Sequence, residues 1–182
     1  MNIIDEIDSD LTRASLECEQ ATLSTVHEFT ADAGIAPLDP VSLDHLGIVV
    51  LALSHELTRR AVRRAWPGSD TSELERRHRQ NLAALLVSRT SSEEPWRGGE
   101  DDSRPGFDDL CATFAQCAGE GETGEAPDLV LRGGQELAAT AGSAGLSILS
   151  MWGAMQVTLM AELLDSRVGD WRSRCPALHG RE

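Results

Sequence analysis

Apolar residues recur at three- and four-residue steps along most of the chain, and no segment shows the strict alternation of a β-strand. The first apolar stripe predicts a helix over residues 2–33 and consists of Ile4, Ile7, Leu11, Ala14, Cys18 and Ala21. A second helix is expected over 40–66, with Asp39 as its N-cap and a proline at its first position. A third is expected over 70–89.

The second half of the chain predicts two further helices, two loops and a tail. A short fourth helix is expected over 107–118, and a long fifth one over 127–168, for which Gly133 and Gly134 are the candidate break. Two acidic stretches rich in glycine and proline, 91–106 and 119–126, read as exposed mobile loops, and residues 170–182 read as a tail. The fold class is therefore all-α, a single bundle of about five helices with two acidic loops.

Composition narrows the function classes. At 182 residues, 1–182 should form one helical domain, and its 16 basic and 30 acidic side chains give a net charge of −14. That charge argues against binding nucleic acid. Every basic residue is Arg and there is no Tyr, so a Schiff-base lysine, a P-loop lysine and a tyrosine acid are excluded. A Gly-x-Gly-x-x-Gly match at 119–124 carries glutamates that would repel a pyrophosphate, and we expect no cofactor.

Location is indicated by the N-terminus and the cysteines. The first eight residues include acids where a signal peptide needs basic residues, and four cysteines lack a Cys-x-x-Cys pair, so we expect a cytoplasmic protein with reduced thiols. Residues 137–161 carry no charge and are long enough to span a bilayer. They are rich in Ser, Thr, Ala and Gly and lack flanking aromatic belts, so a buried helix is favoured and a membrane is not expected.

His78 is the first candidate for acid–base chemistry. It falls on the apolar stripe of its helix, and we expect it to point inward together with Asn81. Either it is a core histidine bonded to Asn81 or to a carbonyl, or it is a general base or metal ligand. Glu75 and His78 form a Glu-x-x-His pair, which di-iron bundles use twice and which occurs here once, so a non-haem metal site is a third hypothesis.

Two further histidines lie on the second predicted helix. His45 and Glu56 fall about 20° apart on the side opposite its main apolar stripe, and Asp44 and His55 do the same. A histidine and a carboxylate that face one cavity can share a proton, although these pairs are too far apart along the helix to touch. Alternatively they simply face water. The candidate catalytic residues are His78, His45, His55 and Glu56.

A ligand pocket and a docking surface complete the candidates. Residues 137–161 are small at one end and rich in Met and Trp at the other, which suits a cavity for a mostly apolar molecule as well as it suits an ordinary core. The candidate substrate-binding residues are Asn81, Met151, Trp152 and Met155. An arginine-rich corner could bind an acidic partner or a phosphate-bearing substrate, or it could be neutralised within the chain. Its members are Arg59, Arg60, Arg63, Arg64, Arg76, Arg77 and Arg79.

These patterns support two main functional hypotheses. The first is a cytoplasmic protein that binds a hydrophobic small molecule and, as an isomerase, cyclase or lyase of biosynthesis, moves protons with histidine and carboxylate groups. The alternative is a non-catalytic interaction or regulatory protein that docks an acidic partner through Arg59, Arg60, Arg63 and Arg64. A homodimer is compatible with both.

Overall fold

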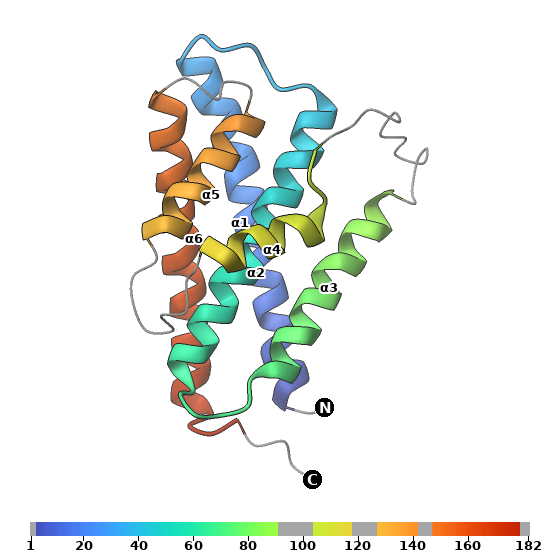
Figure 1. The fold of residues 1–182 in the computed structure, drawn as a ribbon, viewed down its shortest axis with the longest axis vertical. Helices are drawn as coiled ribbons and strands as arrows, with labels where there is room; N and C mark the ends of the chain where they lie inside the picture. The colour runs from blue at the N-terminus through green and yellow to red at the C-terminus, as the bar shows by residue number, and fades with distance from the viewer. Residues whose placement is uncertain (1–2, 91–103, 118–126, 142–146, 179–182) are drawn as a thin grey trace.

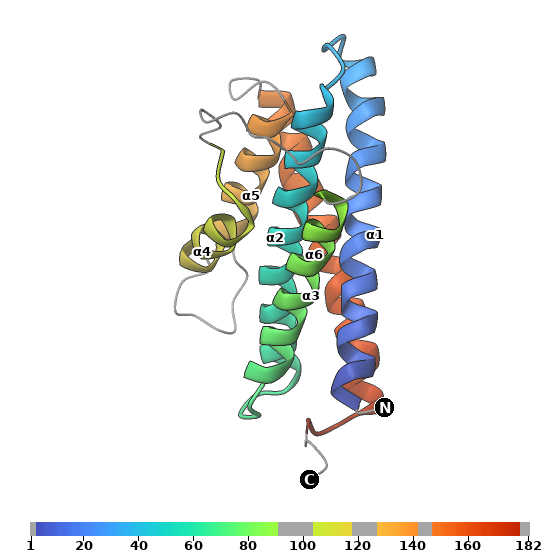
Figure 2. The ribbon, with the colours of Figure 1, turned by 90° about the vertical axis from the view of Figure 1, so that its right-hand side faces the viewer.

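The structure, a computed structural model, describes residues 3–90, 104–117, 127–141 and 147–178, and all regular structure within these ranges is helical (Figure 1). The helices are α1 (Ile3–Asp32), α2 (Pro40–Ala65), α3 (Ser72–Thr90), α4 (Phe107–Cys117), α5 (Pro127–Thr140) and α6 (Ser147–Arg174). Four long helices, α1, α2, α3 and α6, run along the long axis, and α4 lies crosswise against α2, on the side away from α1 (Figures 1 and 2). The expected all-α bundle is confirmed.

Helix α2 forms the centre of the bundle because it contacts each of the other five helices. Its sequence explains this position, since its middle is apolar on every side and residues 49–58 are all buried. Among the described helices, α2 alone is long and apolar enough to cross a membrane, and 72% of its most apolar 18-residue window is buried inside the bundle. Asp39 caps it as expected, accepting a 2.9 Å hydrogen bond from the backbone N–H of Ser42.

The number of helices differs from the expectation of about five. The predicted long fifth helix over 127–168 is divided into α5 and α6 on either side of residues 142–146, which lie outside the described residues. The division is not at the candidate break, because Gly133 and Gly134 lie inside α5. The two helices pack closely at Gly134 and Gly153, where a Cβ added to Gly153 would lie 2.3 Å from the Gly134 carbonyl oxygen. Backbone contact of this kind needs glycine on both sides, and it lets two antiparallel helices share one apolar face.

The predicted loops and tail are only partly within the described residues. Residues 104–106 are non-helical, whereas 91–103 and the predicted loop 119–126 fall outside the described residues. The tail was expected to begin at residue 170, but α6 continues to Arg174. Trp171 explains the longer helix, because it is buried against α1 and its Nε1 donates a 2.9 Å hydrogen bond to Asp10. Trp66 fixes the segment just after α6, because its Nε1 donates a 2.8 Å hydrogen bond to the backbone carbonyl of Cys175.

Candidate functional site

Two buried histidines from adjacent helices meet inside the bundle. His55 of α2 and His78 of α3 lie with their Nδ1 atoms 3.3 Å apart and their ring centroids 5.5 Å apart. His78 keeps 1% of its surface accessible and His55 keeps 7%, so His55 is the member nearer to solvent. A direct nitrogen-to-nitrogen contact requires one ring to donate and the other to accept. Two imidazolium rings cannot make it, because both nitrogens of each would be donors.

A serine of α1 extends this pair into a chain of three side chains. The Ser15 hydroxyl donates to the Leu11 carbonyl oxygen at 3.0 Å and lies 3.2 Å from His78 Nε2. Because the one hydroxyl proton is used on Leu11, His78 must donate from Nε2 to the Ser15 oxygen. The Nδ1 of His78 is then the acceptor for His55 Nδ1–H. This order leaves the lone pair of His55 on its Nε2.

The surroundings keep both rings neutral. Burial lowers the pKa of His55 from 6.5 to about 4, helped by the positive charges of Arg79 and Arg59 and opposed by Glu75. Burial also lowers the pKa of His78 to about 3, with repulsion from His55 adding to the effect. Neutral rings agree with the hydrogen-bond order derived from Ser15.

Charged side chains of α2 and α3 lie within electrostatic range of His55, namely Arg59, Arg79 and Glu75, and further charged groups pair with both arginines. Glu56, 1% exposed, accepts two hydrogen bonds from Arg59 at 2.6 and 2.8 Å. Arg79 of α3 reaches α4, where it pairs with Asp108 at 2.7 Å in an ion pair open to solvent. Cys111 of α4 lies within electrostatic range of Arg79, Asp108 and Glu56, and its pKa is raised by burial to about 12, so its thiol stays protonated. The rim of the site therefore carries a guanidinium whose only described partner, Asp108, is 80% exposed.

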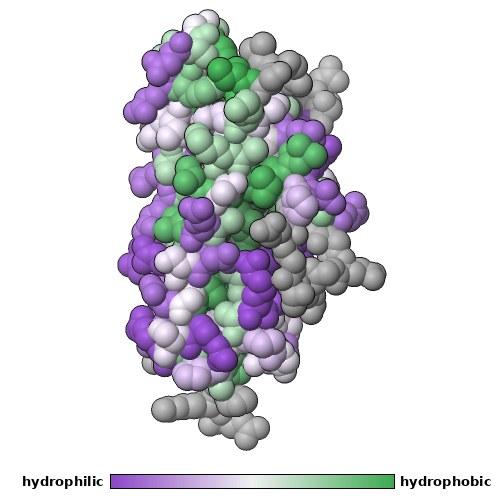
Figure 3. Space-filling model, turned by 90° about the vertical axis from the view of Figure 1, so that its left-hand side faces the viewer, coloured by the Kyte–Doolittle hydropathy of each residue, from purple (hydrophilic) through white to green (hydrophobic). Residues whose placement is uncertain are grey.

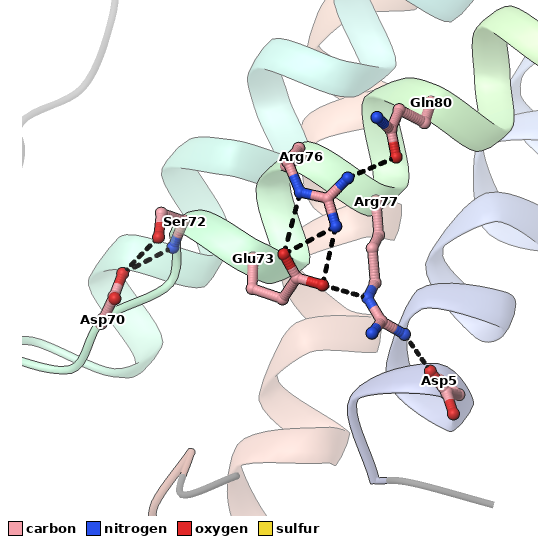
Figure 4. Close-up of polar contacts among 7 residues, drawn as sticks. All are labelled: Asp5, Asp70, Ser72, Glu73, Arg76, Arg77 and Gln80. Atoms are coloured by element: carbon pink, nitrogen blue, oxygen red, sulfur yellow. Dashed lines mark hydrogen bonds and ion pairs between the residues drawn. The ribbon is translucent and has the colours of Figure 1, made fainter.

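A second polar cluster lines the seam between α1 and α3. Glu73 binds Arg76 and Arg77, and Arg77 reaches Asp5 of α1 (Figure 4). A cleft of about 520 Å³ lies beside these residues. Deeper in the seam, burial raises the pKa of the Asp8 carboxyl to about 6, although Arg77 and hydrogen bonding oppose the rise.

Asn81 does not lie beside His78 as expected. It is exposed, and its Nδ2 donates a 2.6 Å hydrogen bond to Asp8 of α1. The actual partners of His78 are His55 and Ser15, which lie on other helices and far from it in the sequence. His45 is also buried, but ten residues of α2 place it about 15 Å along the helix from His55. The structure therefore brings His55 and His78 into direct contact, whereas Glu56 is bound by Arg59.

The expected pocket residues of α6 point in different directions. Trp152 is buried and stacks on Phe29 of α1, with ring centroids 6.0 Å apart. Met151 and Met155 face outward, 73% and 53% exposed. None of these three residues lines the clefts described at the seam between α1 and α3, at the end of α2, or between α1 and the C-terminal part of α6, and these clefts are bordered mainly by polar side chains.

Glu75 is separated from His78 by its own partners. Its carboxylate accepts from Arg63 at 2.8 Å and from the Thr71 hydroxyl at 2.5 Å, and these bonds hold its pKa below the usual value although burial would raise it. Over the part of the chain that the structure describes, no three His, Cys, Asp or Glu side chains gather closely enough to hold a metal ion.

The arginine-rich corner is largely neutralised within the chain. Ion pairs to carboxylates of this chain hold six of its members: Arg59, Arg63, Arg64, Arg76, Arg77 and Arg79. Arg64, for example, reaches Asp165 of α6 at 2.5 Å. These contacts agree with the alternative in which the arginines are neutralised by acidic residues of the same chain.

Comparison with known proteins adds no assignment to this geometry. No family model, no curated protein and no solved structure matches the chain. A functional proposal therefore rests on the arrangement of the side chains themselves, above all on the His55–His78 contact.

Proposed function

We propose that the protein is a small acid–base enzyme of metabolism, of the isomerase or lyase type, in which His55 takes a proton from a small organic acid. The observation that carries the proposal is the hydrogen-bond order Leu11–Ser15–His78–His55, which leaves the Nε2 of His55 unprotonated. A general base needs this state and a fixed orientation. His78 and Ser15 act as positioning residues, because they reach the substrate only through His55.

The charged rim supports an acidic substrate in place of the mostly apolar ligand expected from the sequence. Arg79 pairs with Asp108 in an exposed ion pair, and such pairs stabilise proteins by only about 0–1 kcal/mol. A substrate carboxylate can therefore replace Asp108 on Arg79. Its charge would offset Arg59 and Arg79 and so raise the pKa of His55 from about 4 toward the range in which a base works best.

The proposed step is removal of a proton from the carbon next to the carboxylate or a neighbouring carbonyl. The electron pair of that C–H bond moves onto the substrate as an enolate, while the proton moves to Nε2 of His55. The resulting imidazolium donates its Nδ1–H to His78, whose Nε2–H stays on Ser15. Arg79 stabilises the developing negative charge. Returning the proton to another position gives an isomerase, and expelling a leaving group gives a lyase.

Proton exchange in D₂O tests this proposal without knowledge of the natural substrate. A panel of 2-oxo, 2-hydroxy and 3-oxo acids is incubated with the protein, and loss of the C–H signals is followed by proton NMR. We expect faster exchange of at least one acid than in buffer, abolished by His55→Gln and weakened in apparent affinity by Arg79→Gln. Arg64→Gln is the matched control, since Arg64 also forms an exposed ion pair but with α6. If no acid exchanges above the buffer rate, the proposal is wrong.

A further inference from the structure

One face of the bundle exposes large apolar side chains next to each other on α6. Ile148, Met151, Met155 and Leu159 are each half or more exposed, and Leu131 on the neighbouring α5 is 59% exposed. We call the four α6 residues the α6 stripe. Exposed apolar residues that stand singly are ordinary, but a contiguous row on one helix marks a surface that binds something.

Helix geometry makes the α6 stripe continuous. Its members follow at steps of three, four and four residues, so they lie on one side of the helix over about 16 Å. The opposite side is occupied, because α6 packs on α5, α2 and α1 through residues such as Gly153 and Val157. Figure 3 shows apolar residues gathered on the upper half of the face that carries α5 and α6, and hydrophilic residues below.

Charge separates this face from the remaining surface. No charged residue occurs in 147–161, although charged residues make up 25% of the chain and give it a net charge of −14. Two copies that approach through acidic surfaces repel each other, whereas this face lets them meet without that cost. An anionic membrane surface would repel the chain in the same way.

We propose that the α6 stripe is the interface of a homodimer, in which α6 packs antiparallel on α6 of a second copy. The spacing of the stripe is nearly the same in both directions along α6. A two-fold axis midway between Met151 and Met155 therefore places Met151 of one copy against Met155 of the second copy, and Met155 against Met151. Ile148 then lies against Leu159 of the second copy. This reciprocity is what a two-fold interface demands. The flexible methionines at its centre can adapt to each other.

The stripe supplies the apolar centre of such an interface. A standard interface buries about 800 Å² on each partner, with an apolar centre and a polar rim. Other exposed, uncharged residues of the same two helices can supply the rim of the interface: Thr158 on α6, and Gln135 and Ala139 on α5. The dimer is independent of the proposed chemistry, because His55 and His78 belong to α2 and α3.

The test compares oligomeric state by sedimentation velocity over a range of protein concentrations. We expect the wild-type chain to sediment as a dimer and Met151→Glu and Met155→Glu to sediment as folded monomers, checked by circular dichroism. Val87→Glu is the matched control, because Val87 is 65% exposed on α3 and lies outside the stripe, and it should remain dimeric. A monomeric wild-type chain, or a dimer that survives both glutamates, overturns the proposal.

Cross-linking tests the antiparallel register directly. In a Cys117→Ser/Cys175→Ser background, which removes the two cysteines that are not buried, the double variant Met151→Cys/Met155→Cys should form a disulfide-linked dimer under mild oxidation. Val87→Cys in the same background should not. A dimer that fails to cross-link through the stripe contradicts the proposed pairing. Binding of the wild-type monomer to neutral lipid vesicles would assign the face to a lipid surface and also overturn it.

Discussion

Mild acid should destabilise this protein through its buried histidine pair. The folded-state pKa is about 4 for His55 and about 3 for His78, below the ordinary value of 6.5. Below pH 6.5 the unfolded chain therefore binds protons at these positions while the folded chain does not. Stability from the neutral pair is complete above pH 6.5 and is lost as the pH falls from there toward the folded values.

The size of the effect follows from the two pKa values. Each histidine should cost about 1.4 kcal/mol of unfolding free energy between pH 7.5 and 5.5, or about 2.7 kcal/mol for the pair. Asp8 works in the opposite direction, because burial raises its folded-state pKa to about 6. Its ionised form weakens the fold above pH 6, and protonation relieves that cost as the pH falls. An Asp8→Asn background removes this opposing contribution.

Urea unfolding followed by tryptophan fluorescence measures these free energies. Experiments in the Asp8→Asn background, at one protein concentration and at pH 7.5 and 5.5, stay above the isoelectric point of about 4.7. We expect His55→Gln to remove about half of the pH-dependent loss, and His27→Gln, at an exposed position of α1, to leave it unchanged. If His55→Gln loses as much stability on acidification as its parent, the neutral buried pair is refuted.

Two other predictions test the packing. Gly153→Ala should destabilise the fold by about 1–3 kcal/mol in thermal or urea unfolding, because its Cβ would press on the Gly134 backbone. Gly169→Ala is the control, because Gly169 is also in α6 but a Cβ added there would have no atom within 4 Å, so this change should be neutral or stabilising. Equal effects at both sites would contradict the close contact. Trp171→Phe should cost about 1 kcal/mol through loss of the hydrogen bond to Asp10, and an unchanged unfolding midpoint would show that the bond contributes nothing.

The helices were predictable because the spacing of apolar residues within each segment is enough to define its buried face. Proline at the first position of α2 and the all-round apolar character of its middle correctly indicate a central helix. The division of the predicted fifth helix was missed because residues 137–161 keep an uncharged, helix-compatible composition throughout. The extension of α6 past residue 170 was missed because it depends on Trp171 packing against α1, a contact between the two ends of the chain.

The candidate site was only partly predictable, since it forms between helices. His55 and His78 were each singled out from the pattern of its own helix, but their contact depends on how α2 and α3 pack. One signal was present in the sequence. His55 directly follows the stretch of α2 that is apolar on all sides, so a polar group at this depth of the bundle must meet a partner on another helix. Ser15 carries no local signal, because it looks like any small residue on an apolar stripe.

The protonation of the two histidine rings tests the central claim most directly. Long-range proton–nitrogen NMR on ¹⁵N-histidine-labelled protein at pH 7 reports which ring nitrogen carries hydrogen, with His55→Gln and His78→Gln used for assignment. The account predicts two neutral rings of opposite tautomer, His55 protonated at Nδ1 and His78 at Nε2. An imidazolium at either position, or the same tautomer in both rings, would contradict the hydrogen-bond order on which the proposed base rests.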